Sequence, residues 1–171
     1  MSSVDFRPTG VLRAGHAGLR REASHLARVA GALVGWSNPD VPDQLTAVRG
    51  FLYARLLPHA EAEAAVLYPL MEKVVGAQHA IAMMATDHHE ILHRANALSE
   101  LIVAVGVGPP TVPEAEALRE HLYALWAIVD LHLDKEETIL FPLLDERLSS
   151  TDVSTLNDKM ATFLSGAEVT S

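Results

Sequence analysis

One eleven-residue pattern occurs twice in this chain and constrains its fold more than any other sequence feature. HAEAEAAVLYP at residues 59–69 and HLDKEETILFP at residues 132–142 begin 73 residues apart. The copies share a His, a Glu four residues later, a Leu eight later, an aromatic residue nine later and a Pro ten later. A looser pair surrounds His16 and His88, each with an apolar residue three positions on and a Leu ten positions on. The chain is therefore predicted to contain two related pairs of segments.

Apolar residues recur at steps of three and four in four segments, which is the spacing of one helix face. The segments cover residues 9–34, 43–73, 78–105 and the stretch that begins at Thr111, the expected N-cap. Gly and Pro cluster in the gaps, at residues 36–42, at 76 and at 106–110. Long helices joined by short loops predict an all-α fold, an antiparallel up-down-up-down four-helix bundle over residues 1–150. Residues 151–171 form a weakly amphipathic tail, expected to be a short extra helix with disordered last residues.

Each apolar stripe is interrupted by polar side chains. The six interrupting residues are His16, His59, Glu63, His88, His132 and Glu136. Burying them is costly unless they are satisfied. Residues four apart share a helix face, so each repeat presents one His–Glu pair to the core. Imidazole with carboxylate suits iron, manganese or zinc, and two facing carboxylates can bridge two metal ions. The chain has no Cys, which excludes thiolate zinc sites, iron–sulfur clusters and Cys nucleophiles.

The stripes also predict what surrounds these pairs. After Glu63 the core face is expected to continue through Val66 and Leu70, and after Glu136 through Ile139 and Leu143. Three prolines follow or precede the pairs: Pro58 is expected to bend the second helix, and Pro69 and Pro142 to kink or end their helices.

Two alternatives stay open at the site. His89 and His93 are four residues apart and offer a second pair of imidazoles in place of His88, although their helix face continues through polar residues. Glu137 is expected to face water, but replaces Glu136 if the helix is irregular. The other histidines, His25, His79 and His121, are expected on the surface or at its boundary.

The combined pattern resembles the hemerythrin-like HHE cation-binding domain. The residues that carry the resemblance are His16, His59-x3-Glu63, Asp87-His88 and His132-x3-Glu136, with Pro69 and Pro142 downstream. It covers about residues 9–148. It implies a non-haem site of two iron ions with an oxo or hydroxo bridge, in which Glu63 and Glu136 bridge. His16 and His59 would then belong to one iron, and His88 and His132 to the other.

The match to oxygen-carrying members of that family is incomplete. Their third helix supplies two His four residues apart, whereas Met84 stands four residues before His88 here. Counting ligands leaves about two coordination positions open, which favours chemistry on a bound ligand over reversible carriage.

The sequence therefore predicts a non-haem di-iron protein that binds or reacts with a small ligand: dioxygen, peroxide or nitric oxide. One alternative is an iron- or oxygen-sensing module without turnover; another is a plain structural bundle that binds no metal. The net charge of −9 disfavours nucleic acid as a partner. No signal peptide or membrane-spanning run is visible, so a cytoplasmic protein, monomeric or weakly homo-oligomeric, is expected.

Overall fold

Helices make up all the regular structure in the part of the chain that the computed structural model describes, residues 8–34, 40–76, 78–106 and 108–167. In chain order the elements are α1 (Gly10–Ala32), α2 (Val41–Phe51), the π-helix η1 (Leu52–Leu56), α3 (Leu57–Ala62), the π-helix η2 (Glu63–Leu67), α4 (Tyr68–Val75), α5 (Gln78–Val105), α6 (Val112–Lys135), the π-helix η3 (Glu136–Leu140), α7 (Phe141–Arg147) and α8 (Ser150–Ala167). None of the described helices is long and apolar enough to cross a lipid bilayer.

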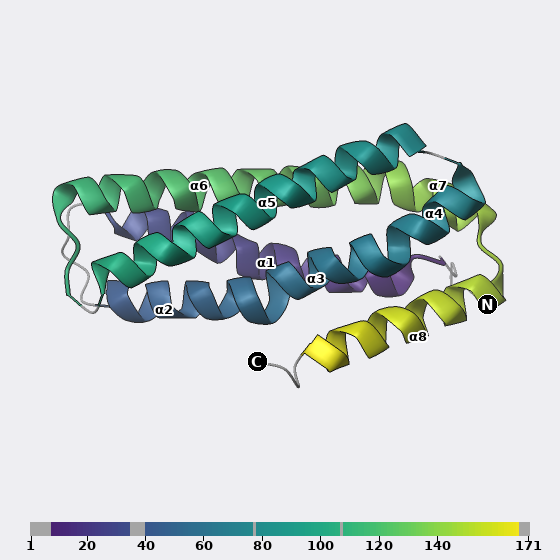
Figure 1. Cartoon of the computed structure of the whole chain (residues 1–171), viewed down its shortest axis with the longest axis horizontal. Helices are drawn as coiled ribbons and strands as arrows, with labels where there is room; N and C mark the ends of the chain where they lie inside the picture. Colours follow the sequence, from purple (N-terminus) through teal and green to yellow (C-terminus); the bar gives the residue numbers. More distant parts are fainter. Residues whose placement is uncertain (1–7, 35–39, 77, 107, 168–171) are drawn as a thin grey trace, which may run out of the picture.

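These elements form four long rods and one further helix (Figure 1). The rods are α1, the run from α2 to α4, α5, and the run from α6 to α7. The rod α1 packs on α6 and α2, and α5 packs on α6, α2 and α4. The helix α8 lies against α3 and η2, so the tail does form the extra helix that the sequence predicts.

The predicted breaks agree with the observed helix ends, with one correction. Gly76 and Gly106 have φ values of 69° and 73°, which favour glycine, and they follow α4 and α5 directly. At Thr111 the backbone N–H and hydroxyl donate to the Glu114 carboxylate, a capping arrangement that fixes the start of α6. Val41 and Pro42, expected in a break, form the first turn of α2, where Pro is well tolerated. Residues 36–39 of that break and the last residues, 168–171, lie outside the described part.

Each π-helix is followed by a proline at the same distance. Pro58, Pro69 and Pro142 are each six residues after the first residue of η1, η2 and η3. Proline has no N–H, and its ring clashes with the carbonyl four residues earlier in an α-helix. In all three places the residue before the proline donates instead to the carbonyl five residues back. The position in α6 that matches Pro58 is Leu131, and there the helix stays α. The wider turns of the π-helices thus accommodate the prolines, and the helices continue past them.

The π-helices change which side chains are buried beyond the site. Ile139 is 55 % exposed, whereas Leu140 is 1 % exposed. In the first repeat Leu67 and Met71 are buried, while Val66 and Leu70 are only half-buried. The predicted stripe through Val66, Leu70, Ile139 and Leu143 was therefore wrong by one residue. A π-turn inserts one extra residue, and every later side chain is rotated around the helix axis.

We expect Leu140→Ala to destabilise the protein much more than Ile139→Ala. Loss of the buried Leu140 side chain leaves a cavity and should cost about 2–5 kcal/mol. Loss of the exposed Ile139 side chain should change the free energy of unfolding by less than about 0.5 kcal/mol. Urea unfolding of both variants measures the difference. Equal losses would contradict the observed register.

The apolar core has two parts, and the polar residues lie between them. Along α1, Leu12 belongs to one cluster and Leu19 to the other, with His16 in between. Along α5, Met84 and Ile91 belong to the same two clusters, on either side of His88. The fold therefore encloses the site with apolar layers above and below.

Candidate metal centre

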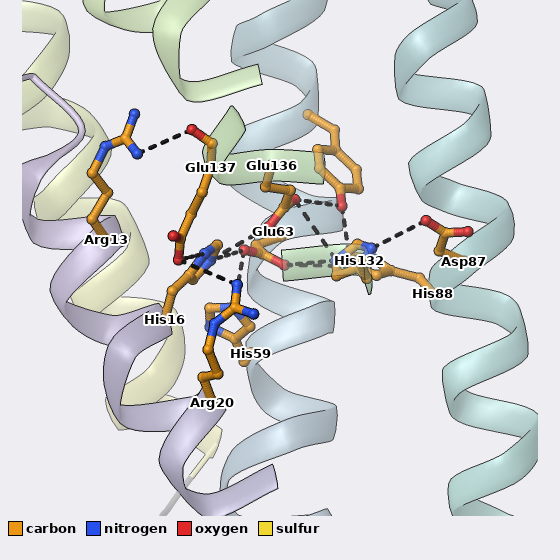
Figure 2. A network of polar contacts seen from close by, with 11 residues as sticks. Arg13, His16, Arg20, His59, Glu63, Asp87, His88, His132, Glu136 and Glu137 are labelled. Atoms are coloured by element: carbon orange, nitrogen blue, oxygen red, sulfur yellow. Dashed lines mark hydrogen bonds and ion pairs between the residues drawn. The ribbon is translucent and has the colours of Figure 1, made fainter. Parts of the chain in front are cut away.

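All six residues that interrupt the predicted stripes converge on one place inside the bundle (Figure 2). His16 comes from α1, His59 from α3 and Glu63 from η2. His88 comes from α5, His132 from α6 and Glu136 from η3. The side chains of His16, Glu63 and Glu136 are fully buried, His132 is 3 % exposed, and His88 and His59 are 11 % and 15 % exposed. Each rod thus supplies part of one enclosed polar cluster.

The first half of the cluster surrounds one oxygen of Glu63. His59 Nε2 lies 3.0 Å from Glu63 Oε1, and His16 Nε2 lies 3.1 Å from the same oxygen. His16 Nε2 is also 3.4 Å from Glu136 Oε2. Two imidazoles therefore face the same carboxylate from two different rods.

The second half surrounds the other Glu63 oxygen. Nε2 of His88 lies 3.3 Å from Glu63 Oε2, and Nε2 of His132 lies 3.8 Å from it. The two Nε2 atoms are 2.9 Å apart. Nε2 of His132 is 3.8 Å from Glu136 Oε1. Glu63 and Glu136 thus both contact imidazoles of the two halves, and Glu63 makes the closer contacts.

The two carboxyl groups titrate in opposite directions in the absence of a metal. Burial raises the pKa of Glu63, but His59 and bonds with His132 and His16 outweigh it and hold the pKa well below its usual value. Burial and the nearby charge of Glu63 raise the pKa of Glu136 well above its usual value. The cluster thus favours one carboxylate and one neutral carboxyl, because two like charges this close cannot both be stable.

The pKa values of two of the imidazoles also shift in opposite directions. Burial lowers the pKa of His59, but the Glu63 carboxylate outweighs this and the net pKa is raised. Burial lowers the pKa of His88 below its usual value, and the proximity of His132 adds to this effect.

Several buried atoms of the cluster have no hydrogen-bond partner of their own. They include His59 Nε2, Glu63 Oε2 and Glu136 Oε2. Buried polar atoms without partners cost about 1–3 kcal/mol each. Positive ions bound in the two halves of the cluster would satisfy all three atoms. Two groups of ligand atoms, each within 4.8 Å of one another, fit this role: His16, His59 and Glu63 in one, and Glu63, His88, His132 and Glu136 in the other. The donor set fits two cations that share Glu63.

Tyr68 belongs to the cluster, and we did not predict it as a site residue. Its hydroxyl donates to Glu136 Oε1 at 2.9 Å and lies 3.0 Å from His88 Nε2. Burial and the charges of Glu136 and Glu63 raise the pKa of this phenol, so it stays protonated. The aromatic position of the repeat was the available signal, but the matching Phe141 has no hydroxyl. Phe141 instead packs against the His16 ring.

Carboxylates outside the cluster lie next to the Nδ1 atoms of two of the imidazoles, and the one beside His132 is within hydrogen-bond distance. Nδ1 of His132 lies 3.5 Å from Asp87 Oδ2, which also accepts a hydrogen bond from Lys135 at 2.7 Å. Nδ1 of His16 lies 3.4 Å from Glu137 Oε1 (Figure 2). Such partners orient metal-binding imidazoles.

The expectation that Glu137 faces water was wrong. Its side chain is 29 % exposed and contacts His16 and, at 3.9 Å, Arg20. Arg13 donates to the Glu137 backbone carbonyl at 3.0 Å. In the π-helix pattern this carbonyl would accept a hydrogen bond from the N–H five residues later, but that residue is Pro142, which has no N–H. The irregular helix thus leaves Glu136 pointing into the cluster and places Glu137 behind His16.

The structure distinguishes His88 from the alternative pair, His89 and His93. His88 lies in the cluster, whereas His89 and His93 are exposed. His79 is exposed, and His25 and His121 are half-buried. None of these five is in either group of converging ligand atoms within the described residues.

Comparison with known proteins gives one match. The family model of the hemerythrin HHE cation-binding domain matches residues 7–147. This range includes every residue of the cluster and ends before α8. No curated protein and no solved structure matches the chain.

Proposed function

The chain belongs to the hemerythrin HHE cation-binding domain family, and from that premise we propose that it is a di-iron protein that binds or reacts with dioxygen, peroxide or nitric oxide. The observation that carries the proposal is the convergence of four imidazoles and two carboxylates between two apolar layers. The short connections between successive rods also support an antiparallel up-down-up-down order for the bundle.

The proposed ligands fall into two sets joined by the carboxylates. His16 and His59 would hold one iron, and His88 and His132 the other, because these pairs lie on opposite oxygens of Glu63. Glu136 would bridge on the opposite side, since its oxygens lie 3.4 Å from His16 and 3.8 Å from His132.

Two bound irons would supply redox chemistry and open coordination positions for a small ligand. Asp87 orients the His132 imidazole, Glu137 lies beside His16, and the apolar layers exclude bulk water. Tyr68 places a hydroxyl 3.0 Å from His88 Nε2, and the residue four positions before His88 is Met84, which provides no imidazole. We propose that this hydroxyl orients a ligand bound at that side by a hydrogen bond.

Metal analysis of protein purified without air tests the function directly. Close to two irons per chain, with near-ultraviolet bands of a bridged pair after exposure to air, is the expected result. A persistent coloured adduct in air would favour binding or sensing, whereas rapid gas evolution from peroxide would favour turnover. A stable, fully helical protein that takes up no iron would refute the di-iron proposal.

Asp87→Asn should weaken metal binding without unfolding the bundle. The carboxylate contacts His132 Nδ1, and loss of such an outer partner usually costs about 10–100-fold in metal affinity. Glu90→Gln is the matched control, because Glu90 on the same helix pairs with Arg94 outside the cluster. Titration of the metal-free proteins with cobalt(II) measures both affinities. Equal affinities in the two variants would show that Asp87 does not support the site.

A further inference from the structure

A pocket on the outside of the bundle lies between the rod that carries Glu63 and α5. Its volume is about 250 Å³, and its walls are mostly alanine and leucine, with two polar side chains that are exposed, Glu61 and His89. The full lining is Leu57, Ala60, Glu61, Ala64, Ala85, His88, His89 and Leu92. None of the residues that the structure describes fills this hollow.

A second, much smaller cavity lies inside the bundle, against the cluster of candidate ligands. Its volume is about 10 Å³, which is about the space that a cavity needs to hold one water molecule. Four of the candidate ligands line it: His59, Glu63, His88 and His132. The rest of its wall is apolar.

The outer pocket and the inner cavity share two residues, Ala60 and His88. Ala60 has the smallest side chain that a helix interior favours, so it leaves space where a larger residue would fill the wall. His88 keeps 11 % exposure, although three of the candidate ligands are fully buried. Ala60 and His88 are therefore the residues at which the outer pocket and the inner cavity adjoin.

We infer that this pocket is the access route of the small ligand to the metal centre, passing between Ala60 and His88. The inference rests on the proposed function. The apolar lining favours an uncharged molecule, because the wall would not replace the hydration of an ion. The inner cavity limits the ligand to the size of a diatomic gas or hydrogen peroxide.

Filling the outer pocket with a bulky side chain tests the route on the iron-loaded protein. Ala85 is exposed and lines the pocket, so Ala85→Trp should block it without disturbing the core. Ala82→Trp is the control, because Ala82 is exposed on the same helix but does not line the pocket. For nitric oxide binding in stopped flow, the association and dissociation rate constants of Ala85→Trp should both fall by at least about tenfold. The dissociation constant should stay unchanged, because a route alters rates and not the bound state.

One result of this experiment would overturn the route. Unchanged rates in Ala85→Trp, with the spectra and the dissociation constant of the unmodified protein, would show that the ligand enters elsewhere.

A metal-free measurement separates failure of the route from failure of the di-iron proposal. The chain has no cysteine, so Val129→Cys, in the wall of the inner cavity, adds a single thiol. In metal-free protein the oxidation of this thiol by hydrogen peroxide, which is within the size limit of the inner cavity, should slow by at least about tenfold when Ala85→Trp is added, but not when Ala82→Trp is added. Equal rates in all three proteins would refute the route even if the protein binds no iron.

Discussion

Glu63→Gln should abolish the proposed dinuclear metal site. Glu63 is the residue shared by both groups of ligand atoms, and each of its oxygens faces two imidazoles. An amide offers one neutral oxygen in place of two charged ones, so it cannot neutralise two cations. We expect the iron content to fall from close to two to below one per chain. The affinity should fall by more than the roughly 100-fold that loss of an outer partner can cause.

Glu61→Gln is the matched control for this prediction. Glu61 lies two residues earlier in the same rod, and its side chain is exposed. The substitution is chemically identical, and the control protein should keep its full iron content. Far-ultraviolet circular dichroism of both metal-free variants checks that the helices are intact. A folded Glu63→Gln protein with two tightly bound irons would contradict the assignment of Glu63 as the shared ligand.

Glu136→Gln should have opposite effects on the metal-free and the metal-bound protein. In the metal-free protein the carboxyl is buried, one of its oxygens has no partner, and its pKa is raised. A group whose folded-state pKa is raised loses its stabilising contribution as the pH rises from its ordinary pKa, about 4.5, through the folded-state pKa. Glutamine is neutral at every pH, and it can still accept the Tyr68 hydrogen bond. Near neutral pH the variant should therefore be more stable without metal, by about 1–3 kcal/mol.

The stabilising effect of iron should be reduced in the same variant. Metal that binds only the folded protein raises its stability in proportion to the logarithm of its affinity. With one bridging carboxylate lost, added iron should raise the melting temperature of Glu136→Gln much less than that of the unmodified protein. Thermal unfolding from pH 4 to pH 8, with and without iron, measures both effects.

The pH dependence provides the critical comparison. The stability advantage of metal-free Glu136→Gln should grow from pH 4 upward and vanish at the acid end, where the carboxyl is protonated in both folded and unfolded chains. Glu63 has the opposite dependence, because its lowered pKa makes its contribution disappear as the pH falls. Both proteins contain Glu63, so its contribution largely cancels when their free energies of unfolding are compared. A variant that is less stable than the unmodified protein near neutral pH would show that Glu136 is charged and well satisfied without metal.

Much of this protein was predictable from the order of residues alone. The stripes of apolar residues predicted the long helices, Gly76 and Gly106 predicted where two of them end, and Thr111 predicted where another begins. The repeated His-x3-Glu identified the residues that gather in the core, because residues four apart on a helix share one face. The same regularity favoured His88 over His89 and His93, since only the former continues an apolar stripe.

Only the tertiary structure decided which side chains complete the site and which surround it. Asp87 and Tyr68 reach His132 and Glu136 from other rods, and such contacts depend on packing that no spacing within one helix encodes. The π-helices also escaped prediction, although each is followed by a proline. A periodic stripe assumes a constant number of residues per turn, and the widened turn at Glu136 breaks that assumption by one residue. The sequence thus determined the helices and the inward-facing ligands, whereas packing across the rods and the widened turns determined what those ligands contact.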